Sequence, residues 1–255
     1  MPPAALLLAL LTAWEAGVAA RGVPVWKLPP PSMIVRAAWE QRAALLEHSA
    51  HTLYEAVLGL LLALLIGVGL AALIDLSPPV RRALYPLLVL SQTVPLFVLA
   101  PWLVILFGFG TAPKVIVVVL VCFFPIVVST SDGLAAADPD ILAWFRAMGA
   151  TRGQVWRKVR FPAALPGLFS GFRIAATYAV IGAIFGEWVG AQKGLGVFIQ
   201  RSFRSSATAQ VLAGVAVTAL LSIGLFGLIW LAERAALPWY YTSSRAAQWN
   251  EPGIY

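Results

Sequence analysis

Long apolar runs are the feature that most constrains this chain. They cover residues 4–20, 53–74, 85–107, 114–131, 164–190 and 209–232. A spanning helix needs about 20 apolar residues, and the second run would form a helix roughly 33 Å long. Runs such as 115–121 are apolar on every face, which is not the alternating pattern of a membrane β-barrel. The sequence therefore predicts an all-α, polytopic membrane protein with about six transmembrane helices.

Composition supports this prediction. The chain is 60% hydrophobic and 11% charged, whereas soluble domains carry about 25% charged residues. The formal net charge is +7. Because the basic residues gather in the loops between apolar runs, we interpret them as contacts to a lipid bilayer, not to nucleic acid.

Cysteine and histidine do not indicate a metal or redox site. Cys122 is the single cysteine and lies in an apolar run, which leaves no partner for an internal disulfide. His48 and His51 lack a third ligand and are interpreted as interfacial polar residues. We expect no metal site and no catalytic residues.

The N-terminal segment, residues 1–52, is predicted to form a first transmembrane helix and an outer amphipathic segment. An alternative is a signal peptide, because Val18-Ala19-Ala20 resembles a cleavage site. Trp14 favours a retained span, since tryptophan is common at membrane interfaces. Residues 32–40 predict an amphipathic helix capped by Ser32.

Residues 132–163 form a polar loop that predicts two short helices. Asp138 is the predicted N-cap of the first helix, Pro139 its first residue, and Gly149 its stop. Its predicted apolar face consists of Ile141, Leu142, Phe145 and Met148.

The second short helix has a capping-box spacing at Thr151 and Gln154, and Pro162 is predicted to end it. Its apolar stripe consists of Val155, Trp156 and Val159. By pattern alone, the pair could be an amphipathic hairpin on the membrane surface or a docking element.

The loop resembles a known signature. Gly149, nine residues and then Val159-Arg160-Phe161-Pro162 are similar to the Gly, nine residues, Ile-x-Leu-Pro signature of the EAA loop in permeases of ATP-binding-cassette (ABC) importers. Further motifs, in order, resemble the nitrate/sulfonate/taurine/thiamine-precursor branch of these permeases: Ser91-Gln92-Thr93-Val94-Pro95, Gly108-Phe109-Gly110, residues 123–128, Leu165-Pro166 and Gly186-Glu187-Trp188.

The resemblance implies a type I (MetI-like) permease fold in the bacterial inner membrane. It implies a permease domain at 53–240, with a cytoplasmic coupling loop at 132–163 and a cytoplasmic tail at 241–255. It further implies three partners: an ABC ATPase subunit, a second permease copy in a homodimer, and a periplasmic or lipid-anchored substrate-binding protein. Because the chain has no GxxxxGK[ST] motif, we expect it not to be an enzyme and to hold no cofactor, with ATP and Mg on the ATPase.

The resemblance assigns ATPase coupling to a set of loop residues: Asp138, Phe145, Arg146, Gly149, Thr151, Gln154, Val159 and Pro162. The chain departs from the family at Ala143-Trp144-Phe145, where the EAA triplet should stand. Two bulky aromatic residues there imply either an ATPase socket of different shape or an ATPase partner of unusual sequence.

The run 164–190 carries small residues four apart, at Gly167 and Gly171 and again at Gly182 and Gly186. This spacing predicts close helix packing in lipid, either within one subunit or against a second copy.

Gln92, Thr93 and Glu187 are polar residues inside predicted spans and are candidates for a substrate pathway. Pro95 is a further candidate, because with Pro101 it breaks the helix and could expose backbone groups to a central cavity. Alternatives remain, since Glu187 could be an outer-interface anchor, and Arg173 and Glu55 could reach the interface from the ends of their spans.

Within the branch, the motifs at 122–128, at Asp132-Gly133-Leu134 and at 186–190 are most similar to those of permeases for the pyrimidine precursor of thiamine, with sulfonate, taurine or nitrate as alternatives. From another class, an ATP-independent secondary transporter or channel subunit would also have six spans.

Overall fold

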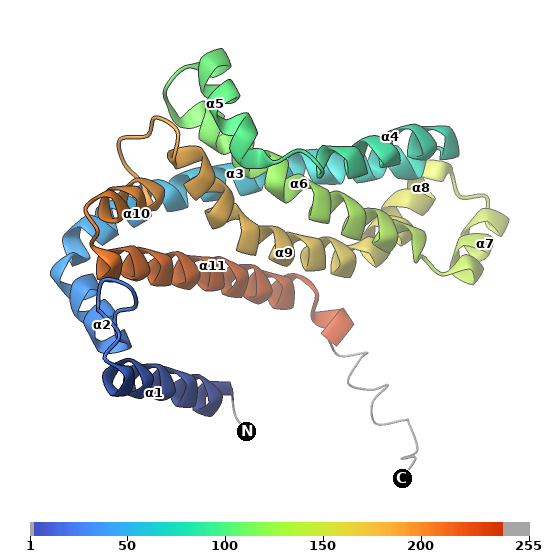
Figure 1. The fold of residues 1–255 in the computed structure, drawn as a ribbon. Helices are drawn as coiled ribbons and strands as arrows, with labels where there is room; N and C mark the ends of the chain where they lie inside the picture. Colours follow the sequence, from blue (N-terminus) through green and yellow to red (C-terminus); the bar gives the residue numbers. More distant parts are fainter. Residues whose placement is uncertain (1–2, 242–255) are drawn as a thin grey trace, which may run out of the picture.

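The computed structural model describes residues 3–241, and the regular structure in that range is helical (Figure 1). Residues 242–255 of the predicted cytoplasmic tail lie outside the described range. The helices are α1 (Pro3–Arg21), α2 (Pro31–Glu40), α3 (Arg42–Leu76), α4 (Pro78–Ser91), α5 (Leu96–Phe107), α6 (Thr111–Ala135), α7 (Pro139–Ala147), α8 (Arg152–Val155), α9 (Phe161–Glu187), α10 (Leu195–Arg204) and α11 (Thr208–Ala236).

Between residues 3 and 241, five helices are long and apolar enough to cross a membrane: Ala4–Arg21, Arg42–Leu76, Thr111–Ala135, Arg152–Glu187 and Thr208–Ala236. The apolar run at 85–107, counted as one span with helix breaks at Pro95 and Pro101, is interrupted at Pro95 but not at Pro101, which lies inside α5. That run is divided between α4, of 14 residues, and α5, of 12 residues, which would reach only about 21 and 18 Å. Pro95 explains the break, because proline lacks an N–H and disfavours helix at the residue before it.

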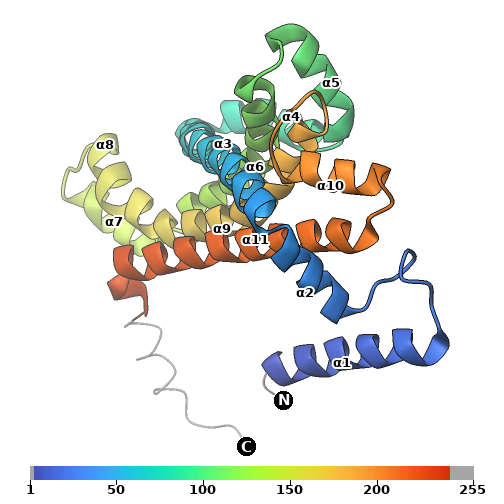
Figure 2. The same ribbon diagram turned by 90° about the vertical axis from the view of Figure 1, so that its left-hand side faces the viewer.

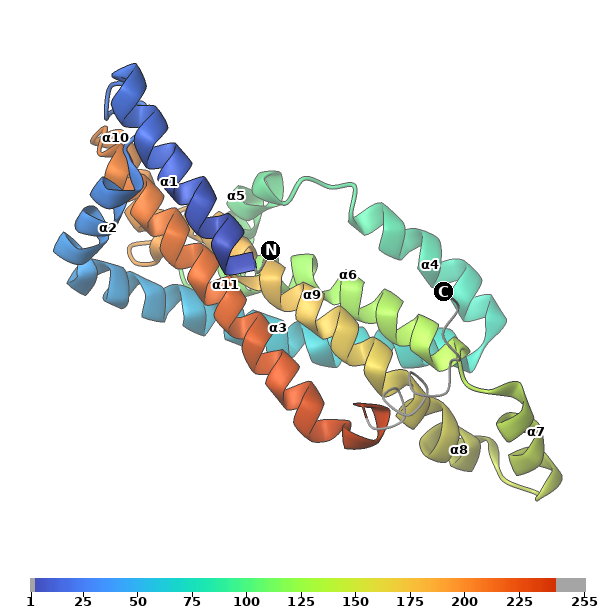
Figure 3. The same ribbon diagram turned by 90° about the horizontal axis from the view of Figure 1, so that it is seen from below.

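Helices α3, α6, α9 and α11 form the central bundle (Figures 1 and 3). α9 makes its most extensive contacts with α6 and lies on α3 and α11 as well. Fully buried apolar side chains fill the bundle, among them Val118, Ile126, Ala175, Ala179 and Val180.

The glycines of α9 face α6 of the same chain. A Cβ built on Gly171 would lie 2.5 Å from the carbonyl oxygen of Pro125, and one on Gly167 would lie 2.6 Å from that of Ser129. On Gly182 and Gly186, a Cβ would meet backbone carbons of α6 at 3.3 and 2.8 Å. This face of α9 is therefore filled within the subunit.

Helix α1 lies apart from the bundle (Figures 1 and 2), and only 6% of its apolar window is buried. Its Glu15 carboxylate accepts hydrogen bonds from the N–H and hydroxyl of Ser32, at 3.0 and 2.7 Å. The predicted Ser32 cap is wrong, because α2 begins at Pro31 and the Ser32 hydroxyl is used by Glu15. Cleavage of the N-terminal segment stays an untested alternative.

The bundle has two distinct ends (Figure 1). α7 and α8 lie at one end, and α2 and α10 lie at the other. α3 runs between them and begins at Arg42, so the boundary predicted at 52–53 falls inside this helix. Its additional N-terminal turns pack beside α10.

We expect Gly171→Ala to lower the free energy of unfolding by about 1–3 kcal/mol, because the added methyl group would push α9 away from α6. The matched control is Gly227→Ala in α11, where a Cβ would meet nothing within 4 Å. Thermal unfolding in detergent, followed by circular dichroism, compares the two. Equal effects of both substitutions would contradict the close contact of α6 and α9.

Candidate functional site

Helix α7 begins and ends where the sequence predicts. The Asp138 carboxylate accepts a hydrogen bond from the N–H of Asp140 at 2.8 Å, and Pro139 is the first helical residue. Gly149 then turns the chain with φ of +76°, a conformation that glycine adopts without steric cost. The next helix can therefore fold back beside α7.

Helix α8 begins with the predicted capping box. The Thr151 N–H donates to Gln154 Oε1 at 2.8 Å, and the Gln154 N–H donates to Thr151 Oγ1 at 3.3 Å. Reciprocal bonds of this kind satisfy two N–H groups that the helix leaves unpaired.

The prediction that Pro162 ends this helix is wrong. A π-helical turn, Trp156–Arg160, follows α8 and leads directly into α9, with Pro162 in the first turn. The N–H of Phe161 bonds to the carbonyl of Trp156, five residues back. The wider turn changes the helical register just before the proline, so Pro162 falls at a position that α9 tolerates.

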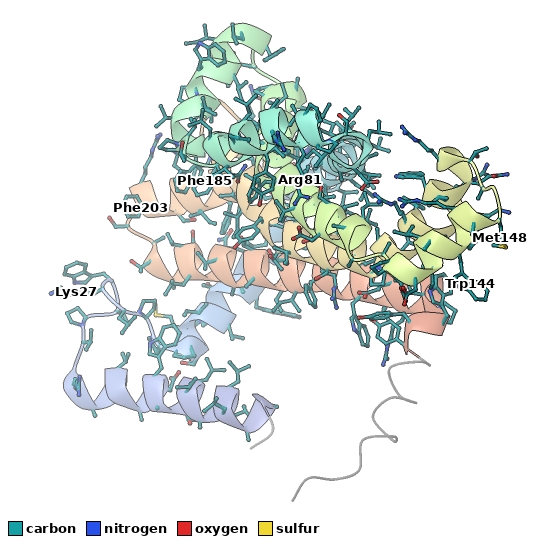
Figure 4. All side chains as sticks on the ribbon, turned by 90° about the vertical axis from the view of Figure 1, so that its right-hand side faces the viewer. Lys27, Arg81, Trp144, Met148, Phe185 and Phe203 are labelled. Atoms are coloured by element: carbon teal, nitrogen blue, oxygen red, sulfur yellow. The ribbon has the colours of Figure 1, made fainter. Side chains whose placement is uncertain are left out.

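Helix α7 packs on α8 and the π-helical turn through a small apolar cluster: Ala137, Leu142, Phe145, Ala150, Val155 and Val159. The predicted apolar face of α7 is only half correct, because Ile141 and Met148 point away from this cluster and are 47% and 68% exposed. Trp144 is 75% exposed and lies at the same end of the molecule as Met148 (Figure 4). Ile141, Trp144 and Met148, spaced three and four apart, form one side of the helix, which we name the exposed α7 face.

An ion pair ties this loop to the spans. The guanidinium of Arg160 binds the carboxylate of Asp75 at the end of α3, and both side chains are largely buried. Sequence reasoning missed Asp75, because the partners are 85 residues apart and no local spacing connects them.

At the opposite end of the bundle, Glu187 is 1% exposed and Thr52 is fully buried. The Thr52 hydroxyl donates to Glu187 Oε1, and the N–H of Gly196 donates to Oε2, both at 2.6 Å. The alternative of Glu187 as an interface anchor is therefore wrong, since its carboxylate is turned into the protein.

These residues also hold the start of α10. The N–H of Leu195 donates to Thr52 Oγ1 at 2.8 Å, and the N–H of Gly194 donates to His48 Nδ1 at 2.9 Å. A helix leaves its first N–H groups without intrahelical partners. Here side chains from α3 and α9 satisfy three N–H groups at or just before the start of α10.

Four other charged groups of the spans form two ion pairs. Lys114 binds Glu55 at 2.8 Å beside Glu187, and Arg173 lies 3.2 Å from the buried Glu233 of α11. The alternative in which Arg173 and Glu55 only extend to the membrane interface is therefore wrong, because both residues form ion pairs between helices. We name His48, Thr52, Glu55, Lys114 and Glu187 the outer polar cluster.

The remaining pathway candidates lie elsewhere. Gln92, Thr93 and Pro95 are exposed in the break between α4 and α5. The Gln92 amide donates to Ser91 Oγ at 3.2 Å, and the Thr93 hydroxyl donates to the carbonyl of Leu90 at 2.8 Å. Glu187 instead bonds to α3 and α10, so the structure does not join the four predicted residues in one hydrogen-bonded group.

We expect Glu187→Ala to destabilise the protein by about 1–3 kcal/mol, because it leaves the Gly196 N–H buried without an acceptor. The Thr52 hydroxyl would keep only the longer bond to the carbonyl of His48, at 3.2 Å. Glu40→Ala is the control, since its ion pair with Arg36 is exposed and worth about 0–1 kcal/mol. Thermal unfolding measures stability, and proteolysis near residue 194 measures release of α10. Unchanged proteolysis of the Glu187 variant would contradict the capping role.

Comparison with known proteins agrees with this architecture. Residues 59–236 match the family described as "Binding-protein-dependent transport system inner membrane component". The formylaminopyrimidine transport permease protein ThiX of Halalkalibacterium halodurans is 39% identical, over 94% of this chain and 96% of that protein. The taurine transport system permease protein TauC of Escherichia coli is 31% identical, over 92% of this chain and 88% of that protein.

A solved structure of the MetNI methionine ABC transporter in an inward-facing conformation has a similar fold. Its TM-score is 0.60 at 22% identity, over 83% of this chain and 97% of that chain. The chain therefore belongs to the family of binding-protein-dependent transport system inner membrane components, and is a multi-pass permease subunit of a bacterial ABC importer.

Proposed function

We propose that the chain forms the membrane path for a formylaminopyrimidine, a thiamine precursor, and that a separate ATPase subunit drives transport by binding the exposed α7 face. The observation that carries the proposal is the position of this face. It presents apolar side chains on a short helix at one end of a helical segment that continues into the spans.

The exposed α7 face suits helix-in-groove recognition, in which apolar side chains on one side of a helix enter a groove of the partner. Trp144 is its largest side chain, and tryptophan often dominates the binding energy of an interface. Trp144 stands where the family has a smaller residue, so we propose a wider and more apolar groove in the ATPase, whereas Phe145 packs inside against α8. ATP and Mg would be held by that subunit.

Motion of α7 would reach the spans by two routes. α8, the π-helical turn and α9 are continuous in sequence and helical structure, and Arg160 ties the turn to Asp75 of α3. ATP-bound and nucleotide-free states of the ATPase dimer would each favour one orientation of this unit, which gives alternating access by differential affinity. A binding protein would deliver the substrate at the outer end.

We further propose a homodimer. α4 and α5 expose large apolar residues at positions that lack cover within the described part of the chain, including Leu87, Leu90, Trp102 and Ile105. A second copy placed against these helices would cover them and would put Gln92, Thr93 and Pro95 beside the path.

The choice of substrate rests on the motifs at 122–134 and 186–190 and on the extent of similarity to ThiX. Taurine or an aliphatic sulfonate is the second candidate, because relatives named for those substrates also cover most of the chain.

Trp144→Ala should weaken binding of the ATPase by about 30-fold or more, as expected for loss of a central aromatic residue. The matched control is Phe203→Ala, because Phe203 is 74% exposed at the other end of the molecule (Figure 4). Co-purification of the ATPase with each variant from membranes measures the effect. Retention of the ATPase by Trp144→Ala would argue against docking at this face.

In cells that hold the chain with its ATPase and binding protein, we expect accumulation of labelled formylaminopyrimidine. A large excess of unlabelled taurine should not reduce this accumulation. Uptake assays with both compounds distinguish the candidates. Competition by taurine, or uptake of labelled taurine alone, would move the assignment to the sulfonate group.

A further inference from the structure

A cavity of about 630 Å³ opens between the end of α3 and the coupling loop. Its wall includes Asp75 and Leu76 from α3, Arg146 from α7, Arg152 from α8, and Trp156 and Arg160 from the π-helical turn. Four elements that would move during transport therefore share one cavity.

The cavity carries excess positive charge. It is lined by three arginines and one carboxylate, and that carboxylate, Asp75, is bound to Arg160. Among residues 3–241, Arg146 and Arg152 form no ion pair with an acidic side chain. Arginine presents several N–H donors in a planar fork, which matches the oxygens of a phosphate.

The same cavity has an apolar side. Leu76 is 70% exposed where α3 ends, and Trp156 stacks on Phe161 with ring centroids 5.2 Å apart. Arg81 and Arg82 follow at the start of α4, so basic residues surround the inner end of α3. Basic pockets between helices on the cytoplasmic side of membrane proteins bind anionic lipid headgroups.

We propose that this cavity binds the phosphate of an anionic phospholipid from the cytoplasmic leaflet. Arg146 and Arg152 contact the phosphate, and Leu76 and Trp156 contact the adjoining hydrocarbon. The apolar side favours a lipid over a free phosphate ion, because a phosphate ion has no hydrocarbon that could contact Leu76.

The position of Arg146 favours a lipid over an acidic patch of the ATPase. Arg146 follows Leu142 by four residues and therefore lies on the side of α7 that packs toward α8. The exposed α7 face lies on a different side of the helix from Arg146. A lipid in the cavity would bridge α3, α7 and α8, so the inner leaflet would help hold the coupling loop to the spans.

The test is lipid binding by the purified full-length chain in detergent, measured by native mass spectrometry. The probes are phosphatidylglycerol, zwitterionic phosphatidylcholine and soluble glycerol 3-phosphate. Arg146→Gln/Arg152→Gln is compared with Arg81→Gln/Arg82→Gln, which also removes two exposed charges at this end but leaves the cavity wall intact. The thermal unfolding midpoint of each variant shows that the variant is folded. Competition between glycerol 3-phosphate and phosphatidylglycerol is measured on the unaltered chain.

We expect the unaltered chain and the Arg81/Arg82 variant to retain phosphatidylglycerol in preference to phosphatidylcholine. The Arg146/Arg152 variant should bind phosphatidylglycerol about 25-fold more weakly, because each of the two arginines contributes about fivefold to binding of an anionic headgroup. Equal loss in both variants, or no preference between the lipids, would overturn the proposal in favour of diffuse attraction.

Two further results would also overturn it. Displacement of phosphatidylglycerol by an equal concentration of glycerol 3-phosphate would identify a small-anion site instead of a lipid site. Unchanged lipid binding together with loss of the ATPase from the Arg146/Arg152 variant would assign the cavity to the ATPase.

Discussion

The close contact of α9 with α6 is the interaction on which the rest of the structure depends. Lipid is as apolar as the helix surfaces, so helices associate in a membrane through tight packing and polar contacts, not through the hydrophobic effect. The glycines of α9 let its backbone reach the carbonyls of Pro125 and Ser129. Because this contact runs along α9, it fixes the positions of both ends of the bundle.

Buried charge connects those ends to the neighbouring helices. At the end that carries α7 and α8, Arg160 and Asp75 join the π-helical turn to α3. At the end that carries α10, Glu187 and Thr52 bind the start of α10, and Lys114 pairs with Glu55 beside them. Breaking such a buried pair is costly because it leaves an uncompensated charge. α3 and α9 are thus joined at both ends, as expected for helices that move as one unit.

Local patterns in the sequence predict much of this structure, whereas distant contacts escape them. The Asp138 cap, the Thr151–Gln154 capping box and the turn at Gly149 follow from residues a few positions apart. The helix breaks before α5 but continues through Pro162, and both outcomes depend on how the helix accommodates a proline. The length of an apolar run does not predict this. The partners of Arg160, Glu187 and Arg173 lie on other helices, so only the fold brings them together.

The most direct test of the account is substrate uptake by proteoliposomes that contain this chain, the ATPase and the binding protein. The account predicts uptake that requires ATP and the binding protein and that continues when ion gradients across the membrane are collapsed. Uptake driven by an ion gradient in the absence of ATP would contradict it and would identify an ATP-independent transporter.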